Sequence, residues 1–455
     1  MGMKPLSLEK IALVTGGKYI GAEDRRGELI TGVVRDSREV RDGSLFVCIR
    51  GARADGHSFA NAAFRAGAAA CLAEREIPDA EGPYILVEST LEAIKKIAKY
   101  YRSLFSIPFV GVTGSVGKTT AKEMVSAVLS RKYCVLKTPE NLNNELGVPL
   151  TILSLREEHE AAVIEMGISD FGEMSRLADI VRPDICIMTA IGSCHLENLG
   201  DLNGVLRAKS EVFNFMKSDG AAVLCGDDAL LAPFEPGVRK ITFGLGENND
   251  FIAKNIENRG FEGIECDIVS KNMSLHAFIP AFGSHMALAA LAAAAVGREL
   301  GVSDEDIRLG LSDYTPVGGR ANVRDTGRIT VIDDCYNANP NSVAASLASL
   351  CAVGGRRVAI LGDMGELGLA AEKLHFSTGE KAAALGVDLL CACGTLSKNT
   401  YDGFLASGGK CAEYFEDKSA LIAALPRLVS DGDTVLVKAS HSGHFEEIVK
   451  ALCEL

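Results

Sequence analysis

A short glycine-rich segment has the residue types and spacing of a loop that holds phosphate groups. It spans residues 111–120 and lies between an apolar run and a stretch with apolar residues at helical spacing. Gly114 and Gly117 let backbone N–H groups converge on phosphate oxygens. Lys118 can reach the β- and γ-phosphates, and the Thr119 hydroxyl can ligate Mg²⁺. The segment therefore predicts an enzyme that binds and hydrolyses ATP. The expected ATP contacts in it are Thr113, Gly114, Ser115, Val116, Gly117, Lys118, Thr119 and Thr120.

This segment departs from the usual G-x-x-x-x-G-K-[ST] pattern at one position. Val112 stands where that pattern has its first glycine. The alternative interpretation is a chance Gly-rich turn after a strand. The order of strand, loop, Lys-Thr pair and amphipathic helix favours phosphate binding over that alternative.

Candidate metal and phosphate contacts follow other apolar runs in the same part of the chain. Glu165 ends one run, and a carboxylate at the carboxyl end of a parallel strand is well placed for Mg²⁺, although such a residue is as often simply solvated. His195 follows another run, and Lys209, taken alone, has the pattern of a helix-surface lysine. Asn141, Asn143 and Asn144 lie in an Asn-rich segment that either forms a turn or donates to phosphates or a sugar.

Two polar segments in the C-terminal third, residues 333–340 and 362–368, each follow a further apolar run. Open α/β sheets bind ligands at the carboxyl ends of their strands. Ligand binding is therefore one interpretation of these segments, and a pair of ordinary strand-to-helix turns is the other.

These residues need a scaffold that brings strand ends together, and the apolar pattern indicates one. Short apolar runs alternate with helical patterns from about residue 107, which is typical of parallel sheets covered on both faces. We expect an α/β fold of three domains: a small α/β domain at 1–105, a central parallel-sheet ATPase domain at 106–314 that holds the phosphate loop, and a C-terminal Rossmann-like domain at 315–455. The expected strands are 44–49, 109–112, 161–165, 185–189, 221–225, 330–333, 357–361, 389–393 and 434–438.

Length, charge and cysteine content exclude several classes of protein. A chain of 455 residues is too long for one hydrophobic core, and a net charge of −13 argues against a nucleic-acid surface. The longest apolar stretch, 286–296, is too short to span a bilayer, and residues 1–11 lack an apolar signal segment. Thirteen cysteines without a C-x-x-C pair favour buried thiols in a reducing cytosol. We therefore expect a cytoplasmic protein with no stable membrane insertion.

Taken together, these segments resemble the Mur ligases, which build the peptide of bacterial cell-wall precursors, along the whole chain and in order. The resemblance implies that Thr119, Glu165 and His195 are Mg²⁺ ligands and that Lys209 is carbamylated and also binds the metal. It further implies that Lys118, His195 and Lys209 are catalytic.

The resemblance also implies contacts outside the phosphate loop. Asn141 and Asn144 would contact ATP from the central domain. The remaining ATP contacts that it implies are Arg320, Asp334, Tyr336 and Asn337. The contacts that it implies for a uridine diphosphate substrate are Ser37, Arg38, Asp55 and His57.

Within the family, the polar segments 333–340 and 362–368 are similar to those of members that use D-alanyl-D-alanine. The resemblance implies an ATP-dependent amide ligase that joins D-alanyl-D-alanine to a UDP-muramoyl tripeptide through an acyl-phosphate, with Mg²⁺ as cofactor, and we expect a monomer. A member that adds a diamino acid would instead show a D-N-P-R segment, which this chain lacks.

Two positions depart from the family pattern. Ala289 stands where the family usually has an Asn near the adenine. His441 replaces the Arg of a K-G-S-R segment near the C-terminus, so a permanently charged side chain becomes a titratable one.

Three other classes share part of the pattern. A regulatory GTPase would show an N-K-x-D motif, and an oxidoreductase would show G-x-G-x-x-G after the first strand of the C-terminal block; neither is present. A folate-polyglutamate-type ligase shares the phosphate loop but would not need the uridine-binding segments of the first block.

Overall fold

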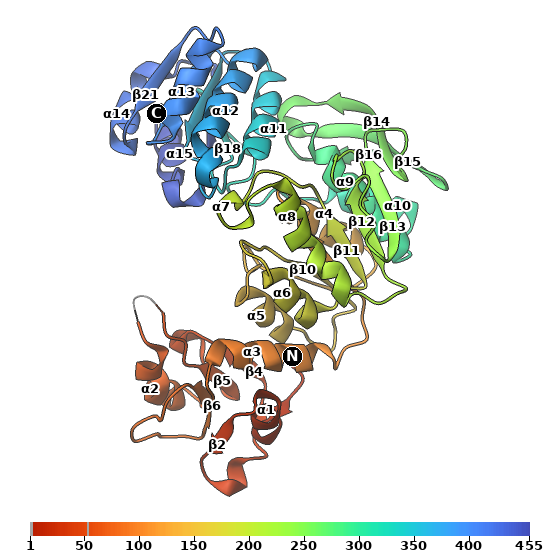
Figure 1. The fold of residues 1–455 in the computed structure, drawn as a ribbon, viewed down its shortest axis with the longest axis vertical. Coiled ribbons are helices and arrows are strands. Elements are labelled where there is room, and N and C mark those ends of the chain that lie inside the picture. Colours follow the sequence, from red (N-terminus) through yellow and green to blue (C-terminus); the bar gives the residue numbers. More distant parts are fainter. Residues whose placement is uncertain (1–2, 52–53) are drawn as a thin grey trace.

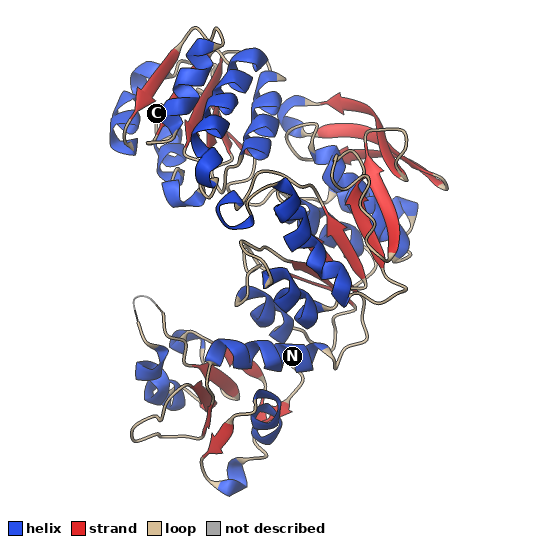
Figure 2. Cartoon of the chain, viewed as in Figure 1, coloured by secondary structure: helices blue, strands red, loops and turns tan. Residues whose placement is uncertain are grey.

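The chain folds into three α/β parts that follow one another in sequence, as the computed structural model in Figures 1 and 2 shows for residues 3–51 and 54–455. The N-terminal and C-terminal parts lie at opposite ends of the molecule, with the central part between them (Figure 1). Each part has its own sheet, and helices pack against it (Figure 2). The expected α/β fold with three domains is thereby confirmed.

The N-terminal part is built on a mixed sheet of strand order β2-β7-β6-β5-β4, beside a short antiparallel pair of β1 and β3. Helix α3 is capped at its N-terminus by the Ser89 hydroxyl and buries one apolar face. The elements of this part are β1 (Leu6–Ser7), α1 (Leu8–Thr15), β2 (Lys18–Ile20), β3 (Leu29–Ile30), β4 (Gly32–Val34), β5 (Ser44–Val47), α2 (Ala60–Arg65), β6 (Ala68–Ala73), β7 (Tyr84–Leu86) and α3 (Thr90–Arg102).

The central sheet has the order β16-β15-β14-β13-β12-β11-β8-β10-β9 among the described residues. Strands β9 to β13 pair in parallel with their neighbours and with β8. The elements are β8 (Phe109–Thr113), α4 (Lys118–Leu129), β9 (Val135–Lys137), α5 (Gly147–Leu153), β10 (Ala161–Glu165), α6 (Glu173–Val181), β11 (Ile185–Met188), α7 (Leu196–Leu199), α8 (Leu202–Ser210), β12 (Ala221–Cys225), β13 (Arg239–Gly244), β14 (Phe251–Asn258), β15 (Ile264–Ser270), β16 (Met273–Ile279), α9 (Met286–Glu299) and α10 (Asp304–Ser312).

The central sheet is not purely parallel, because β14 pairs in parallel with β13 and β15 and β16 then extend the sheet in antiparallel pairing. The prediction of a parallel sheet alone was incomplete here. Along β16, buried side chains alternate with more exposed ones, as in a strand with one face in contact with solvent. This alternation is weaker in the sequence than the continuous apolar runs of the buried strands.

The C-terminal sheet has the order β17-β18-β22-β19-β20-β21 among the described residues, with β17 antiparallel at one edge and the rest parallel. The elements are β17 (Asn322–Asp325), β18 (Thr330–Asp333), α11 (Pro340–Cys351), β19 (Arg357–Gly362), α12 (Ala371–Leu385), β20 (Leu389–Cys393), α13 (Ser397–Ala406), β21 (Ala412–Phe415), α14 (Lys418–Leu428), β22 (Thr434–Lys438) and α15 (Glu446–Cys453).

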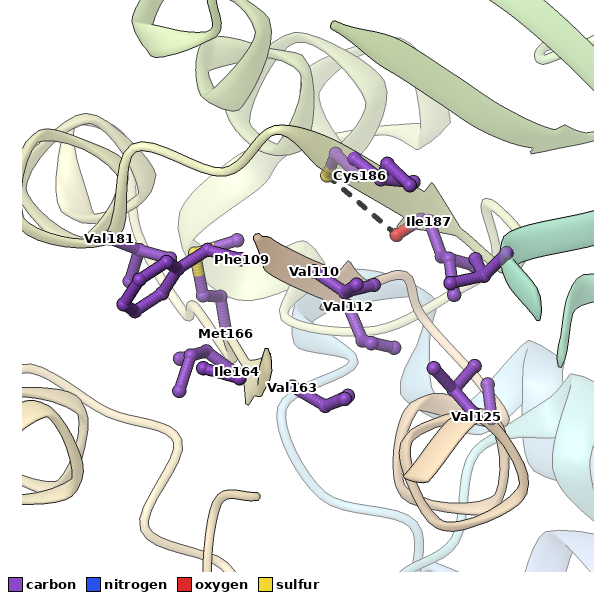
Figure 3. Close-up of a cluster of buried hydrophobic side chains, with 14 of the residues drawn as sticks. Phe109, Val110, Val112, Val125, Val163, Ile164, Met166, Val181, Cys186 and Ile187 are labelled. Carbon is purple, nitrogen blue, oxygen red and sulfur yellow. Dashed lines mark hydrogen bonds between the residues drawn. The ribbon is translucent and has the colours of Figure 1, made fainter. Parts of the chain in front are cut away.

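The core of the central part surrounds β8, which lies between β10 and β11 (Figure 3). Val110 and Val112 point to the same side of β8, as residues two apart in a strand do, and both are fully buried. Val125 of α4 belongs to the same cluster. The strand that leads into the phosphate loop is thus held by apolar packing on one face and by β10 and β11 at its two edges.

The central and C-terminal parts also pack against each other. Phe282 of the central part belongs to the apolar cluster that contains Leu347 and Leu350 of α11.

The cysteines are mostly buried, as expected. Nine of the thirteen free cysteines are buried, while Cys134, Cys411 and Cys453 are exposed. In the described part of the chain, no helix has the length and apolar character needed to cross a lipid bilayer.

Candidate active site

The loop between β8 and α4 has a backbone that only glycine adopts easily at two positions. Gly114 has a φ of +137° and Gly117 a φ of +79°. A Cβ atom on Gly114 would overlap the hydroxyl of Thr189, which follows β11, whereas a Cβ on Gly117 would meet no atom within 4 Å. The Thr189 hydroxyl in turn donates a hydrogen bond to the Val116 carbonyl at 2.5 Å. The neighbouring strand therefore supports the loop from one side.

The polar side chains of this loop lie at the carboxyl ends of the central strands. The Lys118 Nζ atom donates to the Gly114 carbonyl at 2.9 Å across the loop. The Thr119 hydroxyl donates to Glu165 Oε2 at 2.8 Å, and both side chains are buried. The structure therefore brings together a hydroxyl and a carboxylate that the sequence placed 46 positions apart.

Glu165 has further partners that sequence reasoning missed. Asn143 donates through Nδ2 to Glu165 Oε1 at 2.8 Å. The fully buried Lys122 places its Nζ 3.8 Å from Glu165 Oε2 and donates to the Thr138 carbonyl at 2.8 Å. A buried carboxylate without such partners would be strongly destabilising. Lys122 lies three positions after Thr119, so helical spacing was the signal that could have found it.

Glu165 and Thr119 have the donor chemistry of a magnesium site. A carboxylate and a hydroxyl are the hard oxygen ligands that Mg²⁺ prefers, and a metal that also binds phosphate needs few protein ligands. Among residues 3–51 and 54–455, no group of three or more His, Cys, Asp or Glu side chains is arranged to hold a metal on its own. The two oxygens therefore fit a metal that is shared with a nucleotide.

Lys209 is not the surface lysine that its sequence context suggested. It lies in the last turn of α8 with no exposed side-chain area. Burial, with a smaller contribution from the nearby positive charge of Lys118, lowers the pKa of Lys209 to about 8. The structure therefore places a partly neutral amine within electrostatic reach of the phosphate loop.

His195 lies directly before α7 and meets the C-terminal part. Its Nδ1 atom lies 2.6 Å from Glu366 Oε2. Nδ1 makes no hydrogen bond, so the contact is a close approach of the carboxylate to the edge of the ring. This contact holds the pKa of the Glu366 carboxyl below its ordinary value. Glu366 lies in the polar segment 362–368, but nothing local in the sequence indicates that this loop reaches His195.

The remaining central residues predicted for ATP have varied surroundings. Asn144 is exposed, and its Oδ1 accepts from the backbone N–H groups of Leu146 and Gly147 at the start of α5. Asn141 is exposed as well. Thr120 follows Thr119 in α4 and is half-buried. Asn143, between the two predicted residues, is the Asn that contacts Glu165.

Three of the predicted ATP contacts of the C-terminal part follow β18, and the fourth, Arg320, lies just before β17. The guanidinium of Arg320 stacks over the ring of Tyr336, 4.0 Å from its centroid. Asp334 is buried, and its Oδ2 accepts from Lys438 Nζ at 2.7 Å and from the Ser346 hydroxyl at 2.5 Å. Its carboxylate is therefore engaged within the domain.

Asn337 and His441 lie in the same region of the C-terminal part. Asn337 is exposed, and its Oδ1 accepts from the next backbone N–H at 2.9 Å. The ring of His441, which departs from the family pattern, lies 5.4 Å from that of Tyr336, centroid to centroid. Arg320, Tyr336 and His441 thus form an aromatic and cationic surface at one edge of the sheet.

The N-terminal residues predicted for a uridine diphosphate form two separate turns. Arg38 is exposed and pairs with Asp36, which lowers the pKa of Asp36 to about 2. Ser37, between them, is half-buried. Asp55 lies 2.6 Å from Nδ1 of the buried His57, whose Nε2 accepts from a backbone N–H at 2.9 Å. Both ring nitrogens of His57 are engaged, so its direct role is to hold the turn.

Comparison with known proteins identifies related sequences along nearly the whole chain. Three family models match it: "Mur ligase family, catalytic domain" at residues 29–102, "Mur ligase middle domain" at 112–297, and "Mur ligase, glutamate ligase domain" at 319–441. A UDP-N-acetylmuramoyl-tripeptide–D-alanyl-D-alanine ligase of Bacillus subtilis (strain 168) is 37% identical over 432 residues, which cover 94% of each chain.

Solved structures give the same result for the fold. The chain matches a crystal structure of MurF from Acinetobacter baumannii with a TM-score of 0.92 and 31% identity, over 100% of both chains. It matches the MurF ligase of Thermotoga maritima in complex with ADP with a TM-score of 0.83 and 30% identity, over 93% of this chain and 97% of that one.

Proposed function

The chain belongs to the Mur ligase family, and we propose that it joins D-alanyl-D-alanine to a UDP-N-acetylmuramoyl-tripeptide while hydrolysing ATP to ADP and phosphate. The resemblance seen in the sequence is thereby confirmed. The observation that carries the proposal is the likeness to the ligase of Bacillus subtilis, which covers 94% of each chain. The product is a precursor of the bacterial cell wall, and the expected place of the reaction is the cytoplasm.

The first step activates a carboxylate that is otherwise inert toward an amine. An oxygen of the tripeptide's terminal carboxylate attacks the γ-phosphorus of ATP, the bond to the β-phosphate oxygen breaks, and ADP leaves. Such transfers depend on positioning and on neutralisation of charge. The backbone of the phosphate loop and the ammonium of Lys118 would provide the positioning and the charge neutralisation, because they lie between β8 and the first turn of α4.

The second step forms the amide. The amine of D-alanyl-D-alanine attacks the acyl carbon, the carbon–oxygen bond to phosphate breaks, and inorganic phosphate leaves with the former carboxylate oxygen. The attacking amine must lose its protons to a base or to water. A water-poor site protects the acyl-phosphate from hydrolysis, and packing of the C-terminal part against the central part favours such a site.

We assign the metal-binding roles as follows. Thr119 and Glu165 would hold a Mg²⁺ ion at the β- and γ-phosphates, because their oxygens lie together in the buried end of the site. When bound, Mg²⁺ neutralises charge that develops on the phosphate oxygens. His195 and a carbamylated Lys209 would serve a second ion nearer the substrate carboxylate. Buried Lys209, with its lowered pKa, supports carbamylation because the neutral amine is the form that captures carbon dioxide.

Each part of the chain would bind one substrate. We propose that residues 1–105 bind the uridine end of the tripeptide substrate, 106–314 bind ATP, and 315–455 bind the dipeptide. The exposed Arg38, the phosphate loop and the Arg320–Tyr336 surface support this division. We further propose that the enzyme acts as a monomer, because one chain carries all three.

The decisive experiment measures phosphate release with ATP, Mg²⁺ and a UDP-muramoyl tripeptide. D-Alanyl-D-alanine, D-alanine, L-alanyl-L-alanine and diaminopimelate are offered separately as nucleophiles. Turnover should be greatest with D-alanyl-D-alanine. If ¹⁸O is placed in the terminal carboxylate, one label should appear in the released phosphate, because the acyl-phosphate passes that oxygen on.

Two variants distinguish an effect on the phosphate site from an effect on the fold. Lys118→Met should lose at least about a hundredfold in kcat, since removal of one such charge contact costs several kcal/mol. Lys217→Met, on an exposed lysine of the same part, serves as the control and should be fully active. Preference for a diamino acid together with a UDP-muramoyl dipeptide would refute the proposed substrates while leaving the family unchanged.

A further inference from the structure

Residues 190–195, which we call the connecting turn, join β11 to α7 and contact the phosphate loop. The Gly192 N–H donates to the Ser115 hydroxyl at 2.9 Å, and that hydroxyl lies 3.2 Å from the Gly192 carbonyl, to which it can donate. The Ser115 N–H donates to the Ala190 carbonyl at 2.8 Å. Ser115 is buried at this contact. The position of the phosphate loop therefore depends on the position of the connecting turn.

The same turn is held on its other side by the C-terminal part. Its Ser193 N–H donates at 3.2 Å to the Oδ1 atom of Asn341, in the first turn of α11. At its end, His195 Nδ1 meets the Glu366 carboxylate at 2.6 Å. In Figure 1, α7 lies beside the blue C-terminal part, in agreement with its contacts to the short helix Gly368–Ala370. The turn thus bridges two domains.

The connecting turn and the C-terminal loop that holds Glu366 fit together closely. His195 and Glu366 have φ values of +52° and +61°, which side-chain-bearing residues adopt only where their surroundings hold them. The Glu197 N–H donates to the Glu366 carbonyl at 3.3 Å. A Cβ atom on Gly368 would lie 3.1 Å from the Glu197 Cα atom, so this approach requires a small residue. The two segments therefore contact each other through both backbone and side-chain atoms.

We propose that Glu366 is a positioning residue that makes the orientation of His195 depend on the docking of the C-terminal domain. The Glu366 carboxylate beside Nδ1 limits the positions that the imidazole ring can take, so Nε2 is the ring nitrogen left to face a ligand. Through Ser115, the same docking also sets the position of the phosphate loop. The phosphoryl-transfer site is then complete only when the domain that brings the dipeptide is in place. The consequence for turnover rests on the proposed function, whereas the structural coupling does not.

The test compares Glu366→Gln, which keeps the size and removes the charge, with Glu372→Gln. Glu372 is an exposed carboxylate six residues further on, in α12, and serves as the matched control. The first measurement is amide hydrogen exchange of the full chain without substrates. Glu366→Gln should lose protection in the peptide that covers residues 190–199, with exchange elsewhere in the central part as in the wild type. Glu372→Gln should leave the pattern unchanged.

The second measurement is steady-state kinetics. For Glu366→Gln, kcat should fall about 10- to 100-fold, as for other residues that orient a ligand, while KM for ATP and the melting temperature stay close to wild type. Unchanged exchange at 190–199 would overturn the coupling. Changed exchange with wild-type kcat would overturn the positioning role. An inactive wild-type enzyme with the expected exchange pattern would refute the proposed function alone.

Discussion

Glu165 and Lys209 are ionisable residues placed where water has almost no access. The structure treats the two differently. The Glu165 carboxylate accepts hydrogen bonds from Thr119 and Asn143, and the Lys122 Nζ atom lies 3.8 Å from it. Lys209 is buried near another positive charge, so its own charge is disfavoured. Burial thus leaves Glu165 with hydrogen-bond donors and lowers the pKa of Lys209, and the lowered pKa leads to a test.

We expect Lys209 to be carbamylated to an extent that rises with pH. Its pKa of about 8 means that about a tenth of the amine is neutral at pH 7, against well under a thousandth for an ordinary lysine. The neutral amine is the reactive form, so modification should increase from pH 6 and level off above pH 8 at constant dissolved carbon dioxide. The carbamate signal of ¹³CO₂-treated protein in ¹³C NMR measures it.

The control for this measurement is Lys209→Ala, which should lack the signal and be nearly inactive. Short carboxylic acids should restore part of its activity, because they can supply the missing carboxylate. An unmodified Lys209 at pH 8, or a fully active Lys209→Ala enzyme, would contradict the assignment.

At the scale of elements, the phosphate loop depends on the strand beside it as much as on its own glycines. Strand β11 ends at Met188, and Thr189 then fills the space next to Gly114 and binds the Val116 carbonyl. Gly117, at the start of α4, faces open space. The two glycines share a left-handed or related backbone but differ in what surrounds them, which gives them different tolerance to substitution.

Gly114→Ala should destabilise the enzyme more than Gly117→Ala. The first change combines an unfavourable φ of +137° with overlap on Thr189, and we expect a cost of roughly 3 kcal/mol or more. The second adds only the strain of a left-handed alanine, about 1–2 kcal/mol. Thermal unfolding without nucleotide ranks the two variants free of any effect on phosphate binding. Equal melting temperatures would show that Thr189 does not restrict the loop.

At the scale of the whole molecule, the proposed reaction would draw on groups from both the central and the C-terminal parts of the chain. The phosphate loop belongs to the central part, whereas the Arg320–Tyr336 surface and Glu366 belong to the C-terminal part. Ala289 lies half-buried in α9, where the family pattern has an Asn near the adenine. An alanine side chain offers no hydrogen bond, so recognition of the base would have to come from other groups.

We therefore expect this enzyme to discriminate weakly between nucleoside triphosphates. Without a side-chain hydrogen bond at Ala289, kcat/KM for ATP should exceed that for GTP by less than about 200-fold, whereas a hydrogen-bonding site rejects wrong groups by about 10⁴-fold. The measurement is direct competition between the two nucleotides. Ala289→Asn should increase the ratio, and strict ATP preference in the wild type would mean that backbone groups read the base.

The amino-acid sequence by itself determined the elements and the chemistry of the phosphate loop. Strands β10 and β12 begin and end at the residues that the apolar runs indicated. A strand buried on both faces shows in the sequence as a nearly continuous run of apolar side chains. Spacing within one segment likewise placed Lys118 and Thr119 at the start of a helix. Such features depend on neighbours in sequence, so they can be read without a structure.

Only the tertiary structure decided which side chains meet. It selected Asn143 over Asn141 and Asn144 as the partner of Glu165, and it brought Glu366 to His195. It also buried Lys209, which local pattern had placed on a surface. These contacts join residues that are distant in the chain. Their partners follow from how sheets and domains pack, and periodicity along one segment carries no information about that packing.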